Sequence, residues 1–536
     1  LYQITMAYGY WKSGLQNREG VFHMVFRTAP FKGGFTIACG LEDVVHYLKN
    51  FRFTDTDLAY LATLEGSDGK PLFEKPFLKY LEEMELVCDL DAVPEGTVVF
   101  PYEPLLRVQG PLIQCQLLES HILNVVNFQT LIATKAARIC IATKGKPVLE
   151  FGLRRAQGSD GALAASRAAY VGGCVATSNV LAGKHYGIPV RGTMGHSWVM
   201  SFENEREAFA TYAKVMPNNT VLLVDTYSTL RGVQNAIEVG RELRAQGYEL
   251  AGIRLDSGDL AYLSVEARRM LDENGFQETK ILASNDLDEF VVDSLQLQQA
   301  QIDAWGIGTK LVTAYDQPAL DGVYKMGAIR DPGKDWQYKI KIAEQSNKLT
   351  TPGIQQVRRY RQNGRYAADM IFDVQQGLDS PCTMVDPFDI TRQRHFESET
   401  NWEDLLQPVF RQGKATKPHP RTYERARGGG RARRAADGDT VANQEGVPRE
   451  GARAPPRQGR RAQGVSEDGG GDRSARGRKG KTGIRRAAAA ARSATWIGAL
   501  RPYENLRPRV THIIVDFVHR QPRPQKIDLL QPSYKN

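Results

Sequence analysis

Polar side chains able to do chemistry follow several strand-like runs of this sequence. The stretch "IRLDSGDL" (253–260) brings together Arg254, Asp256 and Asp259 beside Ser257. A guanidinium, two carboxylates and exposed backbone amides on one short loop suit a ligand that bears ribose hydroxyls, a phosphate and an anionic group. The structural alternative is an ion pair followed by a helix N-cap, for which Ser257 alone would suffice. We favour the ligand-binding interpretation because all these groups meet at one strand end.

A single histidine, His196, lies in "RGTMGHSWVMSF" (191–202), close to the polar residues Thr193 and Ser197. A lone histidine is by default a buried structural residue, but this one follows a strand-like run. A zinc site would need a second His or Cys three to five residues away, and His185 is too distant. Imidazole titrates near neutral pH, so it can serve as a general base or as a nucleophile that accepts a phosphate. The residues alone leave both roles open.

Two further segments predict contacts with phosphate. In "WGIGTKLVT", Gly306 and Gly308 would let backbone amides approach a phosphate, and Thr309 adds a hydroxyl donor. In "FGLRRAQG", Arg154 follows a buried run, where a guanidinium is a good partner for phosphate oxygens. A Gly-x-Gly pattern is weak when it stands alone, and it gains weight here from the other strand ends. The P-loop pattern GxxxxGK[ST] does not occur in the sequence.

The elements that must position these residues alternate regularly between residues 147 and 310. Short β-rich runs alternate with stretches of helical periodicity, which predicts βα units and a parallel sheet. The strand ends carry Arg, Thr or His, Asp, Asn and Gly, and such ends converge on one rim in a barrel, so we favour a barrel over an open doubly wound sheet. Gly247 and Gly275 stand where helices should end. The predicted strands are 147–155, 188–193, 220–227, 250–259, 280–286 and 302–309, and the predicted helices are 203–216, 229–247, 259–275 and 286–298.

The N-terminal and C-terminal parts have different characters. Residues 1–115 mix strand-like runs at 20–27 and 96–101 with an amphipathic helix at 41–51, which predicts a separate α/β domain. Residues 116–320 form the predicted barrel domain. Residues 501–536 are a piece of uncertain fold in which 510–518 resembles one short strand.

Residues 411–500 are rich in Arg, Gly and Ala and lack any apolar period, so we expect them to be disordered. They hold 22 Lys and Arg against 8 Asp and Glu, a net charge of +14, whereas the whole chain carries +9 and the remainder therefore −5. A basic segment with almost no aromatic residues makes nucleic-acid binding an unfavoured alternative. We interpret the abrupt change of composition as a reading-frame slip or an error in the gene model.

Cysteine spacing and hydropathy indicate the compartment. The six cysteines lie far apart with no CxxC pair, which predicts free buried thiols in a reducing compartment, and hence a cytoplasmic protein. No apolar run approaches the roughly 20 residues that a membrane-spanning helix needs, so we expect no membrane partner.

Taken in order, seven motifs resemble those of the nicotinate phosphoribosyltransferases, a type II phosphoribosyltransferase family, and look closer to its bacterial-type members. The similarity runs from residue 1 to about residue 414, where it ends in "PVFRQGK". The motifs are "LYQITMAYGYW", "FGLRRAQG", "GTMGHSWVMSF", "VLLVDTY", "IRLDSGDL", "GIGT" and "GVYK".

This resemblance implies an N-terminal α/β sandwich-like domain, completed by about residues 320–410, and an irregular (β/α) barrel. It implies that nicotinate reacts with phosphoribosyl pyrophosphate to give nicotinate mononucleotide and pyrophosphate, coupled to ATP hydrolysis. Mg²⁺, or Mn²⁺ in its place, would enter on the pyrophosphate with no protein ligand assigned. A homodimer with shared active sites is implied as well. The near alternative is a nicotinamide phosphoribosyltransferase.

The resemblance also implies roles for individual residues. His196 matches the histidine that ATP phosphorylates, and Asp256 would address the ribose hydroxyls as a second catalytic residue. The family's nicotinate contacts match Thr193, Arg254 and, from the neighbouring subunit, Tyr2. The phosphoribosyl pyrophosphate and its phosphates would be held by Arg154, Asp256, Gly306, Gly308 and Thr309.

Two positions depart from the family pattern. Ser159 stands where proline is common, and Asp321 stands where glycine is usual. Asp321 adds a negative charge near the predicted phosphate loop, so the sequence predicts weaker binding of anions there.

Overall fold

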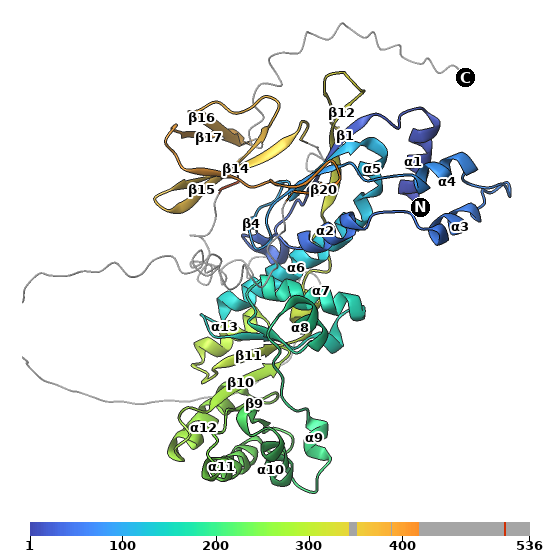
Figure 1. Ribbon diagram of the computed structural model, residues 1–536. Helices are drawn as coiled ribbons and strands as arrows, with labels where there is room; N and C mark the ends of the chain where they lie inside the picture. Colours follow the sequence, from blue (N-terminus) through green and yellow to red (C-terminus); the bar gives the residue numbers. More distant parts are fainter. Residues whose placement is uncertain (342–350, 387–388, 417–508, 511–536) are drawn as a thin grey trace, which may run out of the picture. The chain divides into compact units, whose positions relative to one another are not determined.

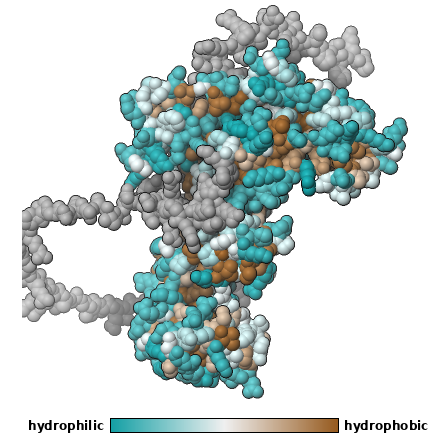
Figure 2. All heavy atoms as spheres, in the orientation of Figure 1, coloured by the Kyte–Doolittle hydropathy of each residue, from teal (hydrophilic) through white to brown (hydrophobic). Residues whose placement is uncertain are grey.

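The computed structural model describes residues 1–341, 351–386 and 389–416, together with the backbone of residues 509–510 (Figure 1). In these ranges no helix combines the length and the apolar character needed to cross a membrane. Hydrophilic residues dominate the face drawn in Figure 2, and hydrophobic residues form separate patches on it.

The N-terminal part is built on an antiparallel sheet whose strands come from both ends of the described chain. Its order is β13-β12-β1-β5-β3-β19-β20. Successive residues of the central strands are buried, and apolar residues such as Met24 and Val108 are fully so. The strands are β1 (Glu19–Val25), β3 (Asp89–Ala92), β5 (Leu106–Pro111), β12 (Val323–Arg330), β13 (Gln337–Tyr338), β19 (Gln407–Arg411) and β20 (Lys414–Ala415).

Helices surround this sheet, and the predictions for this region are confirmed. The predicted helix at 41–51 is α2 (Leu41–Lys49), and the two predicted strands are β1 and β4 (Val98–Val99), the latter paired with β2 (Thr36–Ile37). Helix α6 (Glu119–Ala142) packs against β2 and α2 on one side and against α7 (Gly158–Val171) and α13 of the next region on the other. The remaining helices are α1 (Tyr2–Lys12), α3 (Asp55–Ala62), α4 (Lys75–Glu82) and α5 (Leu112–Leu117).

The second sheet is parallel and has the order β7-β6-β11-β10-β9-β8. Five of its six strands, all except β7, fall within predicted runs, and the helices between them lie outside the sheet (Figure 1). Gly247 and Gly275 follow α11 and α12 with positive φ angles, as expected for residues that end helices. The elements are β6 (Val148–Glu150), β7 (Ala176–Thr177), α8 (Val180–Tyr186), β8 (Val221–Leu223), β9 (Gly252–Leu255), β10 (Lys280–Asn285), β11 (Ala304–Ile307), α10 (Glu205–Val215), α11 (Thr229–Ala245), α12 (Leu260–Glu273) and α13 (Glu289–Leu297).

The predicted strand at 188–193 is wrong, because the segment makes only an isolated bridge between Val190 and Thr177. Pro189, which lacks an N–H, cannot extend a ladder. The strand that pairs here is the short β7, which the sequence pattern did not predict. The side chain of Arg254, on β9, nevertheless donates hydrogen bonds to Thr193, at the end of this segment, and to Met194 just beyond it. The segment 188–193 lies beside β7, and β9 lies near the other end of the strand order. Because Arg254 joins the two, the sheet curves round on itself as an irregular barrel.

The C-terminal part is a β-structure of its own. β14 (Gln355–Gln362) pairs with β15 (Arg365–Asp373), β18 (Trp402–Asp404) flanks β14, and β16 (Cys382–Asp386) pairs with β17 (Asp389–Phe396). β21 (Arg509–Val510) pairs with β15, so only the first residue of the predicted strand 510–518 lies within the described residues.

The prediction of disorder from residue 411 is wrong for residues 411–416, which are ordered. Arg411 and Lys414 belong to β19 and β20, which a tight turn through Gln412 and Gly413 joins, both with positive φ angles. Residues 417–500 of that prediction lie outside the described residues.

Candidate active site

The histidine singled out from the sequence lies at the start of α9 (His196–Met200), at the rim of the parallel sheet. Its Nδ1 lies 3.1 Å from the hydroxyl of Thr226, which follows β8. Its Nε2 lies 3.5 Å from a carboxylate oxygen of Asp256, which follows β9. The side chain is 39% exposed. An imidazole held on both sides and open to solvent is placed for chemistry rather than for packing.

Arg254 is the anchor of the site. Its Nε donates to the hydroxyl of Ser284 at 2.9 Å, and its Nη1 donates to Oγ1 of Thr193 at 2.6 Å and to the carbonyl of Met194 at 3.1 Å. Its Nη2 lies 3.4 Å from Asp256. With 13% of its side chain exposed, the guanidinium is preorganised in one plane, which suits recognition of a planar anion.

Asp256 is fixed both through its side chain and through its backbone. The hydroxyl of Ser284 donates to its carboxylate at 2.5 Å. The backbone N–H of Asp256 and the hydroxyl of Ser257 both donate to one oxygen of Asp225, at 2.8 and 2.6 Å. Asp225 is 8% exposed. A buried carboxylate therefore holds the 256–257 backbone at the rim and leaves the Asp256 side chain beside His196.

Three residues of this cluster were not predicted from the sequence, namely Asp225, Thr226 and Ser284. All three follow or end parallel strands, where side chains gather at the carboxyl edge of the sheet. The same rule could have identified them from the sequence, because 220–227 and 280–286 are predicted strands. Asp259 has a structural role instead: it caps α12 and accepts from the backbone N–H groups of Ala261 and Tyr262, both at 3.1 Å.

The predicted phosphate residues follow the neighbouring strands β6 and β11. Gly306 and Gly308 both lie against Phe151: a Cβ on Gly306 would come within 2.7 Å of its ring, and one on Gly308 within 3.1 Å of its carbonyl oxygen. Close backbone packing thus requires small residues here. Thr309 begins the short helix α14 (Thr309–Val312), and Arg154 is exposed in the 3₁₀ turn η2 (Leu153–Arg155).

Tyr2 does not join the cluster within this chain. It lies on α1, 52% exposed, and its hydroxyl lies 3.4 Å from the hydroxyl of Ser120. All six cysteines are free thiols. Within the described residues, no three or more His, Cys, Asp and Glu side chains come together as metal ligands.

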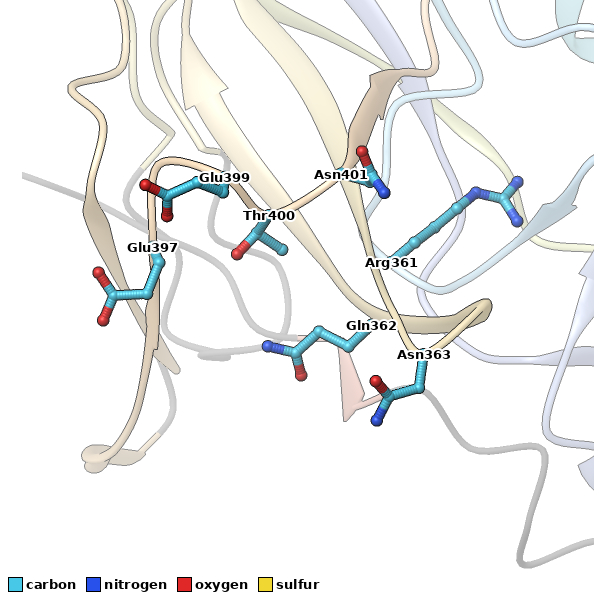
Figure 3. Close-up of a pocket in the computed structure, with 7 residues that line it drawn as sticks. All are labelled: Arg361, Gln362, Asn363, Glu397, Glu399, Thr400 and Asn401. Atoms are coloured by element: carbon cyan, nitrogen blue, oxygen red, sulfur yellow. The ribbon is translucent and has the colours of Figure 1, made fainter.

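A separate cleft of about 480 Å³ lies at the turn between β14 and β15 (Figure 3). It contains none of the predicted site residues. Its arginine, Arg361, points away from Glu397 and Glu399 and donates instead to Glu403 and the hydroxyl of Tyr366. The rim of the parallel sheet, rather than this cleft, is therefore the candidate active site. The cleft is lined by Arg361, Gln362, Asn363, Glu397, Glu399, Thr400 and Asn401.

Comparison with known proteins shows the family to which this chain is related. The family profile of the nicotinate phosphoribosyltransferase N-terminal domain matches residues 1–127, and that of the C-terminal domain matches residues 354–428. The nicotinate phosphoribosyltransferase of Bacillus subtilis is 45% identical over 420 residues, which cover 77% of this chain and 83% of that protein. The enzyme of Caenorhabditis elegans is 40% identical over 71% of this chain and 76% of its own length.

A solved structure is similar as well. The crystal structure of human nicotinic acid phosphoribosyltransferase superposes with a TM-score of 0.69 at 32% identity, covering 81% of this chain and 92% of that chain. The sequence and structural similarity extend over most of both chains and include the rim that carries His196 and Arg254. The chain belongs to the nicotinate phosphoribosyltransferase family.

Proposed function

We propose that this chain transfers the phosphoribosyl group of phosphoribosyl pyrophosphate to nicotinate, yielding nicotinate mononucleotide and pyrophosphate. The observation that carries the proposal is the hydrogen-bonded cluster of Thr193, Arg254, Asp256 and His196 at one rim. Family membership supports the same reaction, because the relatives matched over most of their length are named for it.

Nicotinate would bind at Arg254 and Thr193. Its carboxylate is the natural partner of a guanidinium, and Nη2 of Arg254 makes only a long 3.4 Å contact with Asp256. Bound there, the pyridine nitrogen can attack C1 of the ribose. The bond from C1 to the pyrophosphate oxygen then breaks, and pyrophosphate leaves with the electron pair.

The phosphoribosyl pyrophosphate would lie along the rim from β9 to β6. Asp256 would accept hydrogen bonds from the ribose hydroxyls, while Thr309, the amides near Gly308 and the guanidinium of Arg154 would hold phosphate oxygens. The reaction builds positive character at C1 and negative charge on the leaving group. Fixed donors aimed at the leaving group stabilise that charge without reorganising during the reaction.

His196 would accept the γ-phosphoryl group of ATP. One imidazole nitrogen attacks the γ-phosphorus, the bond to the bridging oxygen breaks, and ADP leaves with the electron pair. The phosphorylated His196 would add negative charge beside the pyrophosphate and would bind Mg²⁺, which would link ATP use to the affinity for one reactant. Water would then cleave the N–P bond, so that inorganic phosphate leaves and the free imidazole is restored. Support comes from the position of the imidazole, which is solvent-accessible and adjacent to Asp256.

Mg²⁺ would enter this site bound to the pyrophosphate oxygens, which are anionic oxygen ligands of the kind that it prefers. It supplies neutralisation of the pyrophosphate charge when bound. Exposed Tyr2 would reach the pyridine in a neighbouring subunit, so the working form would be a homodimer. Six free thiols suit the reducing cytoplasm, where we place the reaction.

The experiment that tests this function compares two labelled substrates on the full chain. Nicotinate and nicotinamide are each supplied with phosphoribosyl pyrophosphate and Mg²⁺, with and without ATP, and mononucleotide formation is followed. We expect turnover of the acid, stimulation by ATP, and at least 100-fold lower kcat/KM for the amide. Preference for the amide, or no mononucleotide from the acid, would overturn the proposal.

A further inference from the structure

One residue at the rim has a strained backbone. Asn285, the last residue of β10, has a φ angle of +135°, a region that residues with a Cβ rarely adopt. Such a conformation is energetically unfavourable and persists only where the surrounding structure imposes it, which is often at ligand-binding sites.

The neighbours of Asn285 belong to the two halves of the proposed substrate site. Ser284, the preceding residue, hydrogen-bonds to both Arg254 and Asp256. In the parallel pairing of β10 with β11, Asn285 lies opposite Ile307, which directly precedes Gly308. Asn285 is therefore interposed between the residues proposed for the ribose hydroxyls and those proposed for phosphate.

The amide of Asn285 has a defined orientation. Its Oδ1 accepts the backbone N–H of Asp286 at 2.7 Å, which assigns the other atom as the Nδ2 amino group. The residue is exposed, and within the described part of the chain Nδ2 has no hydrogen-bond partner assigned. A donor is thus presented at the rim by a backbone held in an unfavourable conformation.

We propose that Nδ2 of Asn285 donates a hydrogen bond to an oxygen of the phosphoribosyl group, making Asn285 a binding residue for that substrate and not for nicotinate. The inference rests on the proposed function, because it uses the substrate assigned there. The strained φ angle falls at the last residue of β10, at the point where the sugar phosphate would cross from β9 to β11.

The test replaces Asn285 by glycine, which tolerates the φ angle and removes only the amide. For Asn285→Gly we expect the KM for phosphoribosyl pyrophosphate and the dissociation constant of ribose 5-phosphate to rise about tenfold or more, the range for a lost hydrogen bond to a charged group. The KM for nicotinate and the inhibition constant of pyrophosphate should stay within twofold. Asn285→Asp should raise the same two constants further, because it replaces the donor by a negative charge.

A matched control is available at the surface. Asn363, in the turn between β14 and β15, also has a positive φ angle of 52°, and Asn363→Gly should leave all four constants unchanged. Ribose 5-phosphate binding is measured calorimetrically, so it is independent of turnover. Absence of nicotinate turnover in the wild type would refute the proposed function alone. Unchanged ribose 5-phosphate binding in Asn285→Gly, or no binding by the wild type, would overturn the role of Asn285.

Discussion

Nη1 of Arg254 and Oγ1 of Thr193 are joined by a 2.6 Å hydrogen bond that spans the parallel sheet from β9 to the segment before α9. This contact fixes the spacing between the arginine proposed to bind nicotinate and the loop that presents His196. The position of the loop that presents His196 and the proposed binding of nicotinate thus depend on the same guanidinium, that of Arg254.

Arg254→Lys should therefore disable the site although it keeps the positive charge. One ammonium group cannot replace the fork that reaches Ser284, Thr193 and Met194. We expect kcat/KM for nicotinate to fall at least 100-fold. The control is Arg244→Lys, on the outer face of α11, where the arginine pairs with exposed Glu249. A variant of Arg254 within fivefold of the wild type would contradict this role.

Thr226 should position the imidazole of His196 through its 3.1 Å contact with Nδ1. Thr226→Val has nearly the same shape but lacks the hydroxyl, so we expect the ATP-stimulated rate to fall about tenfold, in line with the loss of one hydrogen bond to a reacting group. Thr226→Ser should restore most of that rate. Equal rates in the two variants would show that the hydroxyl is not used.

Asp321, where the family resemblance leads us to expect glycine, has a φ angle of +59° and is exposed. Glycine adopts this conformation without steric cost, so Asp321→Gly should raise the free energy of unfolding by about 0.5–1 kcal/mol, measured by urea denaturation. Asp335→Gly, at an exposed position that does not have a positive φ angle, is the control and should give no gain. A destabilised Asp321→Gly would show that the aspartate itself is needed.

His23 should make stability depend on pH. It is buried on β1, where its Nε2 accepts the backbone N–H of Gln355, and burial, with the charge of Arg107 as a smaller cause, lowers its pKa to about 3. In the unfolded chain the pKa of His23 is near 6.5, so below pH 6.5 the unfolded chain binds a proton that the folded protein does not bind. The free energy of unfolding therefore decreases as the pH falls below 6.5.

The expected contribution of His23 to that loss is about 2 kcal/mol between pH 6.5 and pH 5. His23→Gln keeps an acceptor but does not titrate, so its free energy of unfolding should fall less over the same interval by about this amount. Urea denaturation at each pH gives both curves, and parallel curves would assign the acid sensitivity to other groups.

The regular part of the fold could be predicted from sequence because hydrophobic periodicity and helix-ending glycines such as Gly247 are local signals. The short strand β7 could not be predicted, since a strand of two residues is too short to show a hydrophobic periodicity. The bridge at Val190 likewise depends on pairing with Thr177 rather than on its own sequence. The cap of α12 is Asp259 and not Ser257, whose hydroxyl is used by Asp225 from another strand.

The site was predictable to the extent that its residues follow strands. Arg254 and Asp256 could be chosen for that reason, whereas the segment predicted as a strand before His196 makes only an isolated bridge; in the structure Asp256 lies beside both Arg254 and His196. Asp225 acts through the backbone of Asp256, a relationship that only the folded sheet reveals. Tyr2 lies on α1 and contacts Ser120, so its proposed role depends on a second subunit.

The central claim is that His196 accepts phosphate from ATP during turnover. The most direct measurement incubates the full chain with ATP labelled at the γ-phosphate and locates the label on the protein. We predict a label that is labile in acid and stable in base, that maps to the peptide containing His196, and that is absent from His196→Ala. That variant should also lose stimulation of nicotinate turnover by ATP. Equal labelling of His196→Ala, or ATP stimulation that survives the substitution, would contradict the account.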